Sequence, residues 1–255
     1  MLPFNIRHMR LGAGVLTLVV AIAGHSVHSG AVSKPCADFD RLYAAIRDGT
    51  IDRQAARDQI RALLPRVRDD FYARGGRDAA PDTWRFPLEG YAANAIGGKN
   101  GSGYIADGYD YFDGYRSHGH PGHDLFIHDT NQDELDDATG KPVNVLSISS
   151  GIVVAHAPEW DRGSVLRGGR YIYVYDPARS GMFYYAHNRS VLVMPGDIVT
   201  PGQVIATVGR SGRNASAPRS PTHLHVMFLA IEDGYPKPRD IYQDLLRLGT
   251  RSHAR

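Results

Sequence analysis

Residues 194–212, MPGDIVTPGQVIATVGRSG, contain two short runs of Val, Ile and Thr that are separated by Pro201-Gly202. Val, Ile and Thr favour extended strands, and Pro-Gly favours a turn. The same alternation of short apolar runs and turn residues extends to both sides of this stretch. The expected strands are 125–127, 143–148, 152–155, 171–175, 182–186, 198–200, 204–208 and 224–229. Regular short strands with few helical stretches predict a mainly β fold, built on a compact antiparallel β-sheet.

The segment before the β domain has a helical period instead. Its apolar residues recur at helical spacing as Leu42, Ala45, Ile46, Ile60, Leu63, Leu64 and Val67. This pattern predicts two short helices that are broken at Gly49, the second kinked or ended near Pro65. We expect residues 38–75 to form a helical cap that packs on the β domain. The polar, Gly- and Pro-containing stretch 76–87 is expected to be a linker, which leaves residues 88–248 for the β domain.

The N-terminus has the three parts of a secretory signal. A basic start with Arg7 and Arg10 precedes an apolar run over residues 11–24, and small residues follow. We expect residues 1–31 to be a signal peptide or an N-terminal anchor, and the protein to be exported to the periplasm or the extracellular cell envelope. The apolar run is shorter than the roughly 20 residues that span a bilayer, but an uncleaved membrane anchor stays open.

Charge and cysteine content exclude two classes of function. The 255 residues include 29 basic and 27 acidic side chains, and two of the basic ones lie in the leader. Nucleic-acid binding needs a net basic surface, so this near-neutral body argues against a nucleic-acid partner. The single cysteine, Cys36, excludes an internal disulfide and every Cys-based zinc knuckle. Any metal must therefore be held by His, Asp or Glu.

Five residues form the candidate site. They are His120 and Asp124 in GHPGHD, His187 in YYAHN, and His223 and His225 in THLHV. Pro121-Gly122 cannot sit inside a helix, so a turn must bring His120 and Asp124 together. His223 and His225 are two apart in a β-like run, so both rings point to one face. Two histidines and a carboxylate suit an open zinc (Zn2+) site, and further neutral imidazoles could move protons. Spacing alone does not decide which of His223 and His225 binds metal.

This order of motifs resembles the M23 metallopeptidases, the lysostaphin and LytM type of peptidoglycan endopeptidase. HxxxD, YAH and HLH occur in the family's order, and the stretch 194–212 looks like the family segment VKxGDxVxxGQxIGxxGxTG. The resemblance implies a compact antiparallel β metallopeptidase domain. It makes His120, Asp124 and His225 the zinc ligands and His187 and His223 the catalytic pair. Peptides of peptidoglycan, in stems or cross-links, are the substrates that it implies.

Two departures from the family pattern concern the surroundings of the site. The segment 213–222 before HLH is long and irregular, where the family has a short turn. Val226-Met227-Phe228 follows HLH, where the family commonly has Phe-Glu. The five site positions themselves are all present.

Two other functional classes compete with the enzyme. A non-catalytic wall-binding regulator that activates an amidase, together with a regulatory envelope partner, is the alternative. A carrier module is the third class, because GDxVxxGQxI hairpins also occur in biotinyl and lipoyl domains. Such a module needs a lysine on a tight hairpin, and none of Lys34, Lys99, Lys141 and Lys237 has that setting.

Weaker features have mainly structural interpretations. The acidic loop 129–137 begins like a calcium loop, but Glu134 stands where such loops have Gly, and we expect a solvated loop. His123 flanks Asp124 and should face the opposite way on a strand. Tyrosines 104, 109, 111 and 115 precede the first motif and could wall a peptide groove or simply pack.

Overall fold

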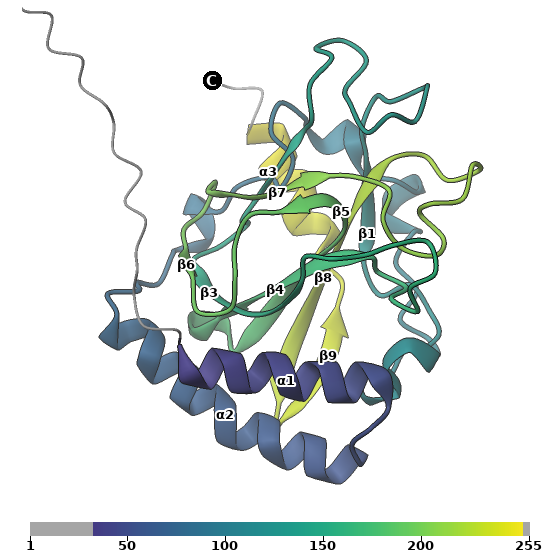
Figure 1. Cartoon of the computed structure of the whole chain (residues 1–255). Coiled ribbons are helices and arrows are strands. Elements are labelled where there is room, and N and C mark those ends of the chain that lie inside the picture. Colours follow the sequence, from purple (N-terminus) through teal and green to yellow (C-terminus); the bar gives the residue numbers. More distant parts are fainter. Residues whose placement is uncertain (1–32, 252–255) are drawn as a thin grey trace, which may run out of the picture. The chain divides into compact units, whose positions relative to one another are not determined.

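A nine-stranded antiparallel sheet forms the centre of the described chain (Figure 1). The computed structural model describes residues 33–251, so the leader expected at residues 1–31 lies outside the described residues. The strands are β1 (His123–Phe126), β2 (Asn144–Leu146), β3 (Gly151–Ala157), β4 (Arg170–Asp176), β5 (Gly181–Val191), β6 (Ile198–Val199), β7 (Val204–Val208), β8 (His223–Glu232) and β9 (Tyr235–Arg239). The main path through the sheet is β1-β8-β5-β4-β3-β6; β2 pairs with β7, which also pairs with β5, and β9 pairs with β8. The mainly β, antiparallel fold is confirmed.

All eight expected strands are present, and one further strand and one further α-helix were not predicted. One is β9, which the prolines Pro236 and Pro238 hide in the sequence because proline cannot donate to a strand ladder. The strand is tolerated here because it pairs with β8 alone. The other is the C-terminal helix α3 (Tyr242–Arg251), whose Leu245 and Leu248 are buried.

Two N-terminal helices, α1 (Lys34–Asp48) and α2 (Arg53–Ala73), lie side by side against the sheet (Figure 1). The hydroxyl of Ser33 accepts a hydrogen bond from the amide of Cys36, so α1 begins before residue 38, the expected start. Gly49 ends α1 with φ of 68°, as the predicted break requires. Short 3-10 helices occupy Pro81–Thr83, Ala93–Ala95, Lys99–Gly101, Tyr111–Arg116 (η4) and Pro177–Arg179.

Helix α2 does not end near Pro65. It continues to Ala73, and Val67 and Phe71 beyond the proline are fully buried, like Ile60 before it. Burial on both sides of Pro65 holds both halves of the helix against the domain and outweighs the hydrogen bond that proline cannot make. Among residues 33–251, no helix is both long and apolar enough to cross a membrane.

The sheet separates two buried clusters. One contains Leu224 and Val226 of β8, together with Leu245 and Leu248 of α3. It also contains Trp84 and Phe86, which are 6% and 3% exposed, so this end of the expected linker 76–87 packs in the core of the domain.

The second cluster lies under the helix pair. It contains Met227 and Leu229 of β8 with the apolar faces of α1 and α2. Because side chains alternate along a strand, His223 and His225 share the face of Met227 and Leu229. The site is therefore on the helix-covered side of the sheet.

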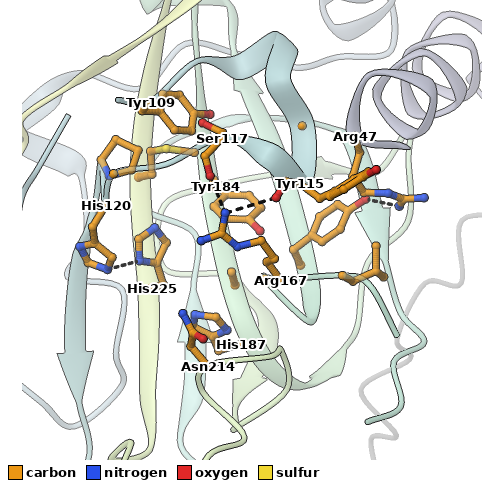
Figure 2. Close-up of a pocket in the computed structure, with 18 of the residues that line it drawn as sticks. Arg47, Tyr109, Tyr115, Ser117, His120, Arg167, Tyr184, His187, Asn214 and His225 are labelled. Carbon is orange, nitrogen blue, oxygen red and sulfur yellow. Dashed lines mark hydrogen bonds between the residues drawn. The ribbon is translucent and has the colours of Figure 1, made fainter. Parts of the chain in front are cut away.

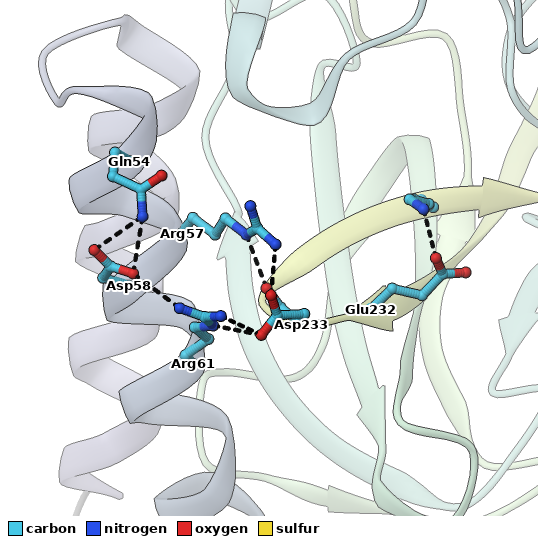
Figure 3. A network of polar contacts seen from close by, with 7 residues as sticks. Gln54, Arg57, Asp58, Arg61, Glu232 and Asp233 are labelled. Carbon is cyan, nitrogen blue, oxygen red and sulfur yellow. Dashed lines mark hydrogen bonds and ion pairs between the residues drawn. The ribbon is translucent and has the colours of Figure 1, made fainter.

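Polar contacts connect α2 to the turn between β8 and β9 (Figure 3). Arg57 Nη2 lies 2.6 Å from Asp233 Oδ2, and the guanidinium of Arg61 pairs with Asp233 Oδ1. These partners are partly or largely exposed, so the buried apolar contacts carry more of the stability than the ion pairs do.

Candidate active site

Three of the five predicted site residues bring ligating atoms to one point. His120 Nε2 and Asp124 Oδ1 are 3.1 Å apart, and His225 Nδ1 lies 3.0 Å from Asp124 Oδ1 and 3.1 Å from His120 Nε2. Two imidazole nitrogens and one carboxylate oxygen are a ligand set that suits zinc and leaves a coordination position open. Among the described residues, this is the group that could hold a metal ion.

Strand pairing sets two of these side chains opposite each other. Asp124 of β1 pairs with His225 of β8, and Phe126 pairs with His223 in the same antiparallel ladder. The Pro121-Gly122 turn then brings His120 back to them. A Cβ at Gly122 would lie 2.5 Å from the Val226 carbonyl oxygen and 2.7 Å from His225 Nε2. The turn therefore needs glycine because of this close approach to β8.

The hydrogen bond of His120 with the backbone tests whether these residues fit a metal. His120 Nδ1 donates to the carbonyl oxygen of Gly103 at 2.7 Å, which leaves the lone pair of neutral His120 on Nε2. That lone pair faces the carboxylate of Asp124 and the nitrogen of His225. Without a metal, a protonated imidazole can donate to the Asp124 carboxylate at these distances. With both ring nitrogens deprotonated, the three atoms can direct lone pairs to one point, so the donor set fits zinc.

The electrostatics of the triad favour an ionised carboxylate. Burial opposes the charge of Asp124, but hydrogen bonds with His120 and His225 hold its pKa well below the usual range. The hydrogen bond with Asp124 raises the pKa of His120, whereas burial lowers the pKa of His225. Asp124 is therefore charged at neutral pH, as a metal ligand must be.

His187 and His223 lie beside the triad. Their ring centroids are 4.9 Å apart, and the His187 ring lies 6.0 Å from that of His225. His187 Nδ1 donates to the Ser211 carbonyl oxygen at 2.8 Å, and His223 Nδ1 donates to the Pro221 carbonyl oxygen at 2.7 Å. In the neutral rings, both Nε2 atoms thus carry lone pairs.

His187 has two unusual properties. Its φ of 66° is in the left-handed region, which is costly for a residue with a side chain and is often found at functional sites. Burial lowers its pKa to about 3, with the neighbouring histidines His223 and His225 acting in the same direction. The ring therefore stays neutral at physiological pH.

The irregular segment before His223 is held by a buried polar network. Arg210, only 8% exposed, donates to the carbonyl oxygens of Ser220 and Ala217. Thr222 Oγ1 donates to Asp129 Oδ2 at 2.5 Å. Asp129 also accepts hydrogen bonds from the backbone of residues 133 and 134, so its carboxylate is used to shape the acidic loop.

The other histidines of the domain lie outside the cluster. His123 is fully buried, and its Nε2 lies 2.9 Å from Asp240 Oδ1. It faces away from the side of β1 that carries Asp124, as predicted. His118, His128 and His156 do not line the pocket around the triad.

All five site residues line a pocket of about 360 Å³. Figure 2 shows three of them, His120, His187 and His225. Its walls include aromatic rings from α1, from η4 and the loop before it, and from the sheet, namely Tyr43, Tyr109, Tyr111, Tyr115, Tyr171, Tyr173 and Tyr184. Tyr104 instead stacks on His123, at 5.8 Å between ring centroids. The pocket also contains Arg167, which sequence reasoning missed because an isolated arginine in a loop carries no motif.

Part of this chain is similar to a known protein family. Residues 133–236 match the sequence model of peptidase family M23. This match includes His187, His223 and His225 but begins after His120 and Asp124, so the folded structure is what adds those two residues to the others. No curated protein matches the chain.

Solved structures with a similar chain path include three peptidases. A candidate glycyl-glycine endopeptidase, lytM, of Ruminococcus gnavus shares 22% identity over 66% of this chain and 62% of its own, with a TM-score of 0.43. A zinc-containing peptidase of Vibrio cholerae shares 22% identity over 64% of this chain and 39% of its own, with a TM-score of 0.39. Lysostaphin of Staphylococcus simulans shares 20% identity over 70% of this chain and 53% of its own, with a TM-score of 0.37.

The chain spans less than two thirds of the length of each of these three structures. The antiparallel sheet, the five clustered residues and the match over residues 133–236 agree with one another. The β domain of this chain is therefore similar to peptidase family M23 over residues 133–236.

Proposed function

We propose that the protein is a zinc-dependent endopeptidase that hydrolyses peptide bonds in the stem peptides or cross-links of peptidoglycan. The observation that carries this proposal is the meeting of His120 Nε2, Asp124 Oδ1 and His225 Nδ1 within 3.1 Å of one another, beside two further histidines. The match of residues 133–236 to a peptidase family supports the reaction type.

His120, Asp124 and His225 would hold the zinc ion. When bound, zinc supplies Lewis acidity, lowering the pKa of a coordinated water towards neutrality and polarising the peptide carbonyl. The ionised Asp124 contributes the charge that this ligand set needs, and Gly103 fixes the ring of His120. Such a hydrogen bond from the distal ring nitrogen orients a ligand histidine and increases its basicity.

His187 and His223 would assist the proton movements. Their Nδ1 atoms are anchored on backbone carbonyls, so each Nε2 is free to accept a proton from the attacking water and to return it to the leaving nitrogen. A protonated ring would then donate a hydrogen bond to the developing oxyanion. The lowered pKa of His187 keeps this residue neutral before the reaction starts.

We also propose that the protein acts outside the cytoplasm. Peptidoglycan is in the cell envelope, and residues 7–31 have the composition of an export signal or anchor. The pocket of about 360 Å³ is lined with tyrosine rings, whose amphipathic character suits contacts with a peptide. Export would bring this pocket to its substrate.

Mass spectrometry of fragments released from purified sacculi tests this function. The zinc-loaded full chain should create new peptide ends, and a zinc chelator should abolish them. The zinc-retaining variant His223→Ala should release none. A zinc-loaded protein that is inert on every type of peptidoglycan would refute the enzyme. If the His120→Ala variant still stimulates an amidase, that result would support the non-catalytic regulator instead.

A further inference from the structure

Arg167 carries a positive charge into the same pocket as the histidine cluster. Its Nη1 donates to the backbone carbonyl oxygens of Tyr115 and Ser117 (Figure 2). Both acceptors are neutral, so they orient the guanidinium but do not cancel its charge. The remaining donors of its planar fork, at Nε and Nη2, have no hydrogen-bond partner in the described part of the chain.

The other charged side chains of the pocket are already compensated. Arg47 pairs with Asp48 at 2.7 Å, and Asp110 pairs with Arg53 at 2.5 Å. Asp124 belongs to the triad. Within residues 33–251, no carboxylate lies within ion-pair distance of Arg167, which sets it apart from the pocket's other arginine. The pocket thus offers an unpaired guanidinium to whatever enters it.

The backbone fixes Arg167 relative to His187. The next residue, Gly168, accepts a hydrogen bond from the His187 amide at 2.9 Å. A Cβ at Gly168 would lie 2.0 Å from the Tyr184 hydroxyl, and one at Gly169 would lie 2.2 Å from the carbonyl carbon of Ser211. Ser211 is also the residue whose carbonyl anchors His187. The loop with Arg167 is therefore packed directly on the strand and loop that hold this histidine.

We propose that Arg167 binds a free carboxylate of the peptide substrate and so selects the bond that is cleaved. A planar guanidinium with two free donor positions fits a carboxylate in bidentate fashion. This inference rests on the proposed function. It predicts that the enzyme prefers stem-peptide bonds flanked by a free carboxylate, such as those of diaminopimelate cross-links, over uncharged glycine bridges.

A pair of synthetic substrates tests the inference. The two cross-linked stem-peptide dimers differ in one feature, the diaminopimelate carboxyl groups, which are free in one dimer and carboxamides in the other. The wild-type full chain with zinc should have a kcat/KM about 10-fold higher on the free carboxylate, the size expected for a partly exposed charge-assisted hydrogen bond. In Arg167→Gln this ratio should fall to about 1.

Arg170→Gln is the matched control. Arg170 also donates to two backbone carbonyl oxygens, those of Pro158 and Trp160, but it does not line the pocket. Its ratio should equal that of the wild type. Each ratio compares two substrates with one protein preparation. A smaller folded fraction of a variant lowers both values of kcat/KM equally and leaves their ratio unchanged.

Calorimetric binding of the same two dimers separates this inference from the proposed function. A carboxylate preference that disappears in Arg167→Gln, in the absence of cleavage, would keep the role of Arg167 and remove the endopeptidase. Equal kcat/KM of the wild type on both dimers would overturn the role of Arg167 while leaving the endopeptidase in place. An unchanged preference in Arg167→Gln would do the same.

Discussion

Asp124 and His225 face each other across the β1–β8 ladder, with Asp124 Oδ1 3.0 Å from His225 Nδ1. Two strands far apart in the sequence thus share one ligand set. Small displacements of β1 against β8 should change the ligand geometry directly, which makes this interface the structural support of the site.

The Gly122→Ala substitution should disturb that interface. The added Cβ would approach the Val226 carbonyl oxygen and the ring of His225 to within 2.7 Å. The backbone of Val226 cannot move away without shifting β8. We expect a loss of about 1–3 kcal/mol in the free energy of unfolding, measured by urea denaturation, and weaker zinc binding, measured by competition with a chelator.

Gly103→Ala provides the control for this substitution. Gly103 is also next to the site, but its added Cβ would meet one atom at 3.6 Å, which is an ordinary contact. Its carbonyl oxygen still accepts from His120. Equal losses in the two variants would contradict the assigned role of the close approach at Gly122.

The helix pair should behave as part of the domain. Ile60 of α2 is fully buried in the cluster beneath the helices, so Ile60→Ala should lower the free energy of unfolding by about 2–5 kcal/mol. Asp233→Asn removes the exposed ion pairs of Figure 3 and should lower the free energy of unfolding much less than Ile60→Ala does. Urea unfolding measures both values. A larger loss from Asp233→Asn than from Ile60→Ala would show that ion pairs, and not burial, hold α2 in place.

Cys36 should be unreactive in the folded protein. Its side chain has no exposed surface, and burial raises the pKa of its thiol to about 11, so little thiolate forms at mildly alkaline pH. Alkylation followed by mass spectrometry should therefore proceed at the rate of unfolding and become rapid only in denaturant. Rapid labelling under native conditions would mean that α1 opens readily from the sheet.

Local patterns in the sequence predict most of the sheet. The runs of Val, Ile and Tyr locate eight strands, and the two-residue spacing of His223 and His225 predicts their common face. Prolines 236 and 238 concealed β9. Proline is tolerated in a strand at the edge of a sheet, and the sequence does not show which strand lies at the edge. Pro65 likewise failed to end α2 because burial on both sides of it is a tertiary effect.

The site is less accessible to sequence reasoning where long-range contacts decide. GHPGHD, YAH and HLH identify the five side chains, but the carbonyl groups of Gly103, Ser211 and Pro221 that orient three of the rings leave no trace in residue type. Arg167 could not be recognised from the sequence either. Its importance depends on whether a carboxylate lies beside it, and none does among the described residues. The family resemblance makes His225 the ligand, and His225 Nδ1 lies 3.0 Å from Asp124 Oδ1.

The zinc content of two single variants tests the central claim most directly. Purified His225→Ala and His223→Ala, each loaded with zinc and dialysed, are compared by elemental mass spectrometry with the wild type. Because His225 Nδ1 lies in the triad and His223 Nε2 is 3.7 Å from Asp124 Oδ1, we expect His225→Ala to lose its zinc. His223→Ala should keep about one zinc per chain while losing about 100-fold or more of its activity. Zinc retained in His225→Ala and lost in His223→Ala would contradict the assignment of the site.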